Sequence, residues 1–170
     1  MIRVDFKSQQ LTLQNKKTYL FATLFVIGNI LLPQLCHLVP KGGLIFLPIY
    51  FFTLIAAYKF GPTIGLLTAF FSVSVNHVLF GMPPLAVLPI LLVKSGILAI
   101  IAGWVGKRNS LSILSLIAIV LGYQVLGGFA EWAMIDLGSA IQDFTLGWPG
   151  MLFQVVGAFI ILRLMAKYEC

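Results

Sequence analysis

Apolar residues fill this chain in six long stretches, separated by short segments that hold most of the charged residues. The stretches lie at about 19–38, 44–58, 62–79, 85–106, 111–135 and 146–165. A helix of ~20 apolar residues crosses the hydrocarbon core of a bilayer, and only the second stretch is clearly shorter. The period-two alternation of barrel strands is absent. Because backbone polar groups in lipid need internal partners, the pattern predicts six transmembrane helices.

The composition supports a membrane environment. Hydrophobic residues make up 60% of the 170 residues and charged residues only 9%, and the mean hydropathy is +1.04. That is too much apolar surface for a water-soluble core. We therefore expect one all-α integral membrane domain over 1–170, with a cytoplasmic N-terminal segment at 1–17 and a compact six-helix bundle at 18–167.

The basic residues follow the alternation of the spans. If the first span starts inside, nine of the eleven Lys and Arg residues are cytoplasmic: Arg3, Lys7, Lys16, Lys17, Lys59, Lys107, Arg108, Arg163 and Lys167. Only Lys41 then faces outward, and Lys94 lies within a span. By the positive-inside rule, both termini are cytoplasmic. The topology thus explains the net charge of +6 without a nucleic-acid partner. We expect a multi-pass protein of a prokaryotic plasma membrane.

Polar side chains within the spans collect toward the outer side, which predicts a cavity that is open to the outside. Polar groups in a bilayer usually face the bundle or a water-filled cavity. The candidate substrate-binding residues are His37, Tyr50, Asn76, His77, Lys94, Gln124, Glu131, Trp132, Trp148 and Gln154. The His and aromatic residues are the weaker candidates, because such side chains are common at membrane interfaces.

Lys94 is the most informative single residue. It lies roughly 13 Å below the outer start of its span at 1.5 Å per residue, where a Lys costs ~2.5–3.5 kcal/mol on insertion scales. One interpretation is a structural ion pair with Glu131. The other is a cation that meets an anionic or carbonyl-bearing ligand, with Glu131 as its resting partner or as a second ligand contact. Gln124 and Glu131 share a helix face, and Gly127 between them leaves room for a ligand or another helix.

Catalytic and nucleotide-binding motifs are missing from the chain. It has no HExxH, GxSxG or P-loop pattern, and five acidic residues leave little for hydrolytic or metal chemistry. Cys36 is expected near the outer end of the first span and Cys170 at the cytoplasmic terminus, so the two cannot pair within one molecule. We expect a non-enzymatic protein without a metal or cofactor of its own, whose energy for any uphill transport comes from a partner or an ion gradient.

Several segments, in this order and spacing, resemble the S components of energy-coupling factor (ECF) vitamin transporters. They are 47–49 (LPI), 60–62 (FGP), 65–67 (GLL), 80–84 (FGMPP), 96–103, and 147–150 (GWPG) followed by Gln154. The similarity extends over about 37–167. It is carried by the order of these segments together with the number of spans.

The resemblance implies a six-helix bundle that binds a vitamin or related small solute from outside. The site is expected in the loop after the first span and in the outer parts of the fourth to sixth spans. The implied partners are a membrane-embedded coupling subunit and two ATPases, which alone use ATP. Many members have Glu where this chain has Lys94, which favours a carboxylate-bearing or otherwise electron-rich solute here. The alternatives are a non-transporting membrane scaffold or assembly protein and a stand-alone secondary carrier.

Overall fold

The computed structural model describes residues 3–108 and 110–168, and it is about 81% helical. Within these residues, five helices are long and apolar enough to cross a membrane: α1 (Lys16–Cys36), α4 (Pro62–Phe80), α5 (Leu88–Gly106), α6 (Ile113–Met134) and α7 (Leu137–Tyr168). The chain is therefore an all-α, multi-pass membrane protein.

The second predicted span is broken. It contains α2 (Gly42–Phe46), the 3-10 turn η1 (Pro48–Tyr50) and α3 (Phe51–Phe60), and its continuous apolar helix from Pro48 is shorter than the five long helices. Leu47 has a φ of +46°, a left-handed conformation that ends α2. Pro48 then starts the next turn, where its missing N–H costs nothing.

The sixth predicted span begins about nine residues earlier than expected, because α7 starts at Leu137 rather than near 146. Asp136 caps this start: its carboxylate accepts hydrogen bonds from the Ser139 backbone N–H (2.9 Å) and hydroxyl (2.7 Å). These bonds lower the pKa of Asp136. The segment 147–150, at the start of the sixth predicted span, is helical even at Pro149. Asp143 thereby becomes a helical residue.

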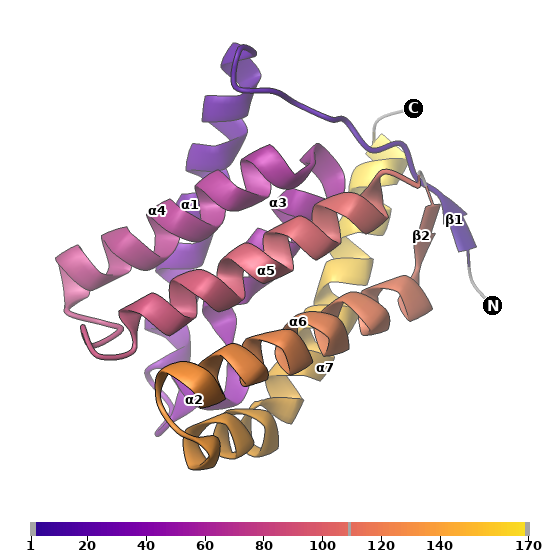
Figure 1. The fold of residues 1–170 in the computed structure, drawn as a ribbon. Coiled ribbons are helices and arrows are strands. Elements are labelled where there is room, and N and C mark those ends of the chain that lie inside the picture. The colour runs from indigo at the N-terminus through magenta and orange to yellow at the C-terminus, as the bar shows by residue number, and fades with distance from the viewer. Residues whose placement is uncertain (1–2, 109, 169–170) are drawn as a thin grey trace.

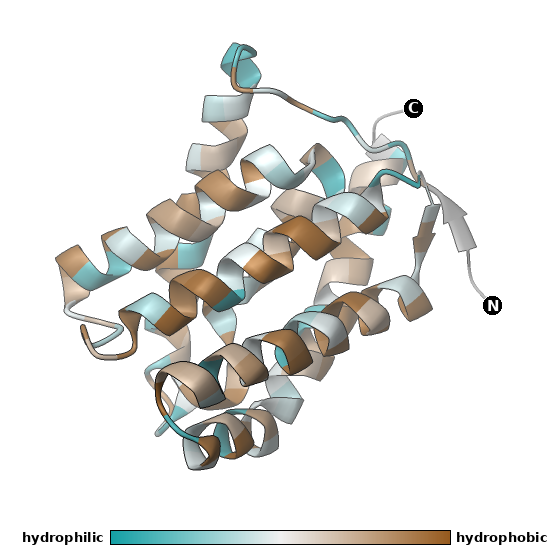
Figure 2. Cartoon of the chain, viewed as in Figure 1, coloured by the Kyte–Doolittle hydropathy of each residue, from teal (hydrophilic) through white to brown (hydrophobic). Residues whose placement is uncertain are grey.

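The helices form two layers (Figure 1). Helices α4, α5 and α6 lie side by side, and α1, α3 and α7 cross behind them. The short α3 is central: its residues 54–60 are almost fully buried against α4, α5 and α7. Many large apolar side chains of the long helices are exposed, and hydrophobic colours predominate along these helices (Figure 2). Such a surface fits a lipid surrounding.

A small two-stranded ribbon, not expected from the sequence, lies at one end of the bundle. Strand β1 (Arg3–Asp5) pairs antiparallel with β2 (Ser110–Ser112), and the C-terminal part of α7 reaches the same end (Figure 1). Lys59, expected in a solvated loop, is instead fully buried there. Its Nζ donates to the Lys7 carbonyl (2.8 Å) and lies 4.7 Å from the centre of the Phe6 ring. The N-terminal segment thus packs onto the bundle.

Candidate binding site

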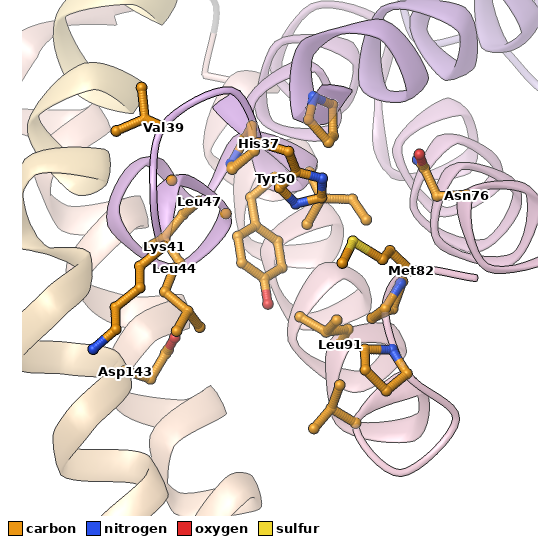
Figure 3. Close-up of a pocket in the computed structure, with 18 of the residues that line it drawn as sticks. His37, Val39, Lys41, Leu44, Leu47, Tyr50, Asn76, Met82, Leu91 and Asp143 are labelled. Carbon is orange, nitrogen blue, oxygen red and sulfur yellow. The ribbon is translucent and has the colours of Figure 1, made fainter. Parts of the chain in front are cut away.

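A cavity of about 430 Å³ lies at the end of the bundle opposite the ribbon. Its wall is formed by the end of α1 and the loop after it, by α2 and η1, by the neighbouring ends of α4 and α5 with the loop between them, and by one side chain from α7 (Figure 3). The lining residues are Pro33, His37, Val39, Pro40, Lys41, Gly42, Gly43, Leu44, Leu47, Pro48, Ile49, Tyr50, Asn76, Met82, Pro83, Pro84, Val87, Leu91 and Asp143. Most are apolar, so a bound molecule would bury much of its surface against hydrocarbon.

Glycines allow the wall segment α2 to pack closely on its neighbours. A Cβ at Gly42 would lie 1.9 Å from the Cys36 carbonyl oxygen, so the turn out of α1 requires glycine at this position. A Cβ at Gly150 would lie 2.5 Å from the Phe46 backbone. The segment 147–150, which carried part of the family resemblance, is therefore a packing surface on which α2 rests.

Three of the predicted site residues line this cavity. Tyr50 is 1% exposed, and its ring packs 5.3 Å from that of Tyr123. The amide of Asn76 is engaged, because its Nδ2 donates to the Asn29 carbonyl (3.0 Å) and the Ser72 carbonyl (2.9 Å). His37 is exposed at the rim.

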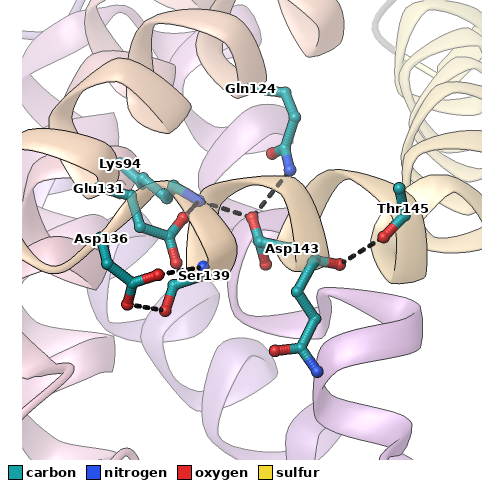
Figure 4. Close-up of polar contacts among 8 residues, drawn as sticks. Lys94, Gln124, Glu131, Asp136, Ser139, Asp143 and Thr145 are labelled. Carbon is teal, nitrogen blue, oxygen red and sulfur yellow. Dashed lines mark hydrogen bonds and ion pairs between the residues drawn. The ribbon is translucent and has the colours of Figure 1, made fainter.

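A largely buried charged cluster adjoins the cavity through Asp143, and Figure 4 shows its contacts. Lys94 from α5 makes ion pairs with Glu131 of α6 and Asp143 of α7, the second at 2.5 Å. Gln124 of α6 also donates to Asp143, at 2.8 Å. The predicted Lys94–Glu131 pair is present, and the cluster holds one cation and two anions.

Asp143 is the residue that sequence reasoning missed. It joins the two parts of the site, because it both lines the cavity and pairs with Lys94. A span assumed to begin near 146 left it in a loop. The apolar residues Leu137, Ile141 and Phe144, spaced by four and three, indicate that the helix extends upstream and could have placed Asp143 correctly.

Two predicted residues have supporting positions. Gln154 donates to the Leu47 carbonyl (3.4 Å) and accepts from the Tyr123 hydroxyl (3.1 Å), which holds the corner between α2 and η1. His77 donates through Nδ1 to the Pro83 carbonyl (2.7 Å) and fixes the loop between α4 and α5. Both stabilise the cavity wall.

The two predicted tryptophans do not lie in the cavity. Trp148 is 57% exposed and Trp132 is 53% exposed. Trp132 borders a second hollow of about 340 Å³ between α6 and α7, together with Gln124. Their positions are those of aromatic residues facing lipid or the interface rather than stacking on a ligand in the cavity.

Comparisons of the chain with protein-family models, curated proteins and solved structures find no match. Within 3–108 and 110–168, no group of three His, Cys, Asp or Glu residues is placed to hold a metal ion. The fold and the site define a helical membrane protein with a largely apolar cavity, backed by a buried ionic cluster.

Proposed function

We propose that this protein is the S component of an ECF-type transporter and binds a vitamin or related small solute. The observation that carries the proposal is the cavity itself, with Asp143 in its wall and mostly apolar residues around it. Its volume falls in the range of about 300–1,000 Å³ typical of small-molecule sites. It is built from the loop after α1 and the neighbouring ends of α4, α5 and α7. The loop after α1, α5 and α7 are among the parts where the family resemblance implies a site, whereas α4 is not and α6 does not line the cavity.

The proposed topology has six membrane crossings, with the short helix Pro48–Phe60 inside the second, and both termini in the cytoplasm of a prokaryotic cell. The distribution of Lys and Arg supports this orientation. The ribbon end, which gathers the N-terminal segment and the 107–112 segment, would face the cytoplasm. The cavity would then open to the outside.

Energy for uptake would come from partners. The sequence has no phosphate-binding loop, so we propose that the chain acts with a membrane-embedded coupling subunit and two ATPases, has no catalytic role and needs no cofactor of its own. Solute capture would be its own contribution.

Two measurements test this proposal. Native mass spectrometry of the purified chain should detect a co-purifying small molecule. Vesicles that contain the chain, coupling subunit and ATPases should accumulate that molecule only with enclosed ATP, and vesicles with the chain alone should not. A chain that carries no solute and gives no uptake with these partners would contradict the proposal and favour a scaffold role.

A stand-alone secondary carrier is the second candidate. The buried Lys94, Glu131 and Asp143 cluster favours it, because ionisable groups at membrane depth mark ion and proton pathways in carriers. Concentrative uptake by the chain alone, driven by a proton or sodium gradient without ATP, would establish this alternative.

A further inference from the structure

We infer that the cavity selects a solute whose polar end donates hydrogen bonds or carries positive charge, and disfavours a carboxylate-bearing solute. The inference rests on the proposed solute-binding function and reverses the charge expected from Lys94 alone. Three features carry it: the free side of Asp143, the hydroxyl of Tyr50 and the charge balance behind them.

Asp143 presents one carboxylate oxygen for a ligand. Both of its bonds, from Lys94 Nζ (2.5 Å) and Gln124 Nε2 (2.8 Å), go to the same oxygen, Oδ2. Within the described part of the chain, Oδ1 has no hydrogen-bond donor, and Figure 4 shows it turned away from the two bonds. Because an ionised carboxylate only accepts hydrogen bonds, the group of the solute that binds Oδ1 must be a hydrogen-bond donor.

Tyr50 supplies a second group of the same kind. Its side chain is 1% exposed, yet its hydroxyl makes no hydrogen bond within 3–108 and 110–168 and extends into the cavity (Figure 3). The hydroxyl is therefore open to a ligand in the cavity and would not have to give up a protein partner to bind it. Because a hydroxyl can donate or accept, Tyr50 tolerates several solutes, and Asp143 sets the preference.

The charge balance disfavours an anion. Lys94 is 2% exposed and is already paired with both Glu131 and Asp143, so little of its attraction is left for a third carboxylate. The three groups sum to a formal charge of −1. An ammonium, an amidine or the N–H edge of a heterocycle beside Oδ1 would balance it, whereas a carboxylate would add a further buried negative charge.

The positive groups at the rim do not reverse this balance. Lys41 and His37 also line the cavity, but both are exposed. Solvent and salt weaken the field of these exposed charges more than that of the Asp143 carboxylate, whose side chain is only 13% exposed. The apolar lining, including Leu44, Leu91 and Met82, adds the second requirement, which is a hydrophobic or aromatic body.

Three probes that share an indole ring test the inference: tryptamine, which is cationic, tryptophol, which is neutral, and indole-3-propionate, which is anionic. Their binding to the purified chain in phosphatidylcholine nanodiscs is measured by equilibrium dialysis, with empty nanodiscs subtracted. We expect the Kd of tryptamine to be at least about tenfold lower than that of indole-3-propionate, a difference of about 1.4 kcal/mol, with tryptophol between them.

Two variants locate the preference. Asp143→Asn keeps the balanced Lys94–Glu131 pair, so this variant should fold. Its Kd values for tryptamine and indole-3-propionate should lie within about threefold of each other, which is less than the tenfold difference of about 1.4 kcal/mol expected for the unmodified chain. Tyr50→Phe should weaken both tryptamine and tryptophol. Lys107→Gln, at the opposite end of the bundle, is the control for a general change of charge.

Equal or tighter binding of indole-3-propionate, an unchanged preference in Asp143→Asn, or binding of none of the probes would overturn the inference. The proposed function is judged separately by the co-purifying molecule. If the co-purifying molecule is a carboxylate without an amino or other donor group, the proposed solute-binding function stands and the charge preference is refuted.

Discussion

Gly127 lies directly against the side chain of Lys94. A Cβ added at Gly127 would come within 2.7 Å of Lys94 Cγ and 3.1 Å of Lys94 Cε, so the absence of a side chain on α6 makes room for the stem of the buried cation. Lys94 is held at its far end by Glu131 and Asp143 and cannot move aside easily. The ionic cluster therefore requires a residue without a side chain at position 127.

This relationship predicts that Gly127→Ala destabilises the protein although alanine is the better helix former. We expect a cost of about 1–3 kcal/mol from overpacking against Lys94, observed as earlier loss of the monodisperse species on heating in detergent. The matched control is Gly128→Ala, because a Cβ at Gly128 meets nothing within 4 Å. It should be neutral or slightly stabilising. Equal stability of the two variants would contradict the close contact.

The charge balance of the cluster leads to a second prediction. Lys94→Ala leaves the buried carboxylate of Glu131 and the partly buried carboxylate of Asp143 without a cation, which should cost about 3–5 kcal/mol and prevent recovery of folded protein. The triple variant with Lys94→Met, Glu131→Gln and Asp143→Asn removes all three charges and should restore a monodisperse protein. Restoration by Lys94→Ala with Glu131→Gln alone would show that Asp143 is not a full partner of Lys94.

The helical membrane class could be predicted from the sequence because long apolar stretches have few other structures open to them in lipid. Where the helices of the structure differ from the predicted bounds, a local feature sets the bound. The left-handed Leu47 breaks the second stretch, and the Asp136 cap starts α7 well before its apolar part. Neither feature changes the average hydropathy of its segment, so hydropathy alone does not locate it. Only the spacing of the apolar residues in 137–144 points to the earlier start of α7.

The candidate site was predicted in part, and the reason lies in tertiary contacts. Lys94 and Glu131 stood out because charges at membrane depth need partners. Asp143 did not stand out, since its partner lies 49 residues away and its own helix was placed too late. The unpaired hydroxyl of Tyr50 and the exposure of Trp148 depend on how the helices pack against one another. The spacing of residues along the sequence does not predict that packing.

The packing of the N-terminal segment predicts that it contributes to stability. Phe6 is 2% exposed, packs 5.5 Å from the Tyr58 ring and lies under the Lys59 ammonium. Phe6→Ala should cost about 3–5 kcal/mol, as for other buried aromatic residues, and should raise cleavage of the segment in limited proteolysis. Lys7→Ala is the control, because its side chain is exposed and the carbonyl that accepts from Lys59 is retained. Unchanged proteolysis of Phe6→Ala would refute a packed segment.

The last prediction concerns sidedness, on which the outward-facing cavity depends. In a background with Cys36→Ser and Cys170→Ser, single substitutions Ala86→Cys and Lys107→Cys place a thiol at the two ends of the bundle, and both positions are exposed. Ala86 lies in the loop between α4 and α5 beside the cavity, whereas Lys107 follows α5 beside the ribbon. Because the excess of Lys and Arg marks the ribbon end as cytoplasmic, a membrane-impermeant maleimide should label Ala86→Cys in intact cells. It should label Lys107→Cys only after the membrane is permeabilised. The opposite labelling pattern would turn the cavity toward the cytoplasm and remove the basis for capture of a solute from outside.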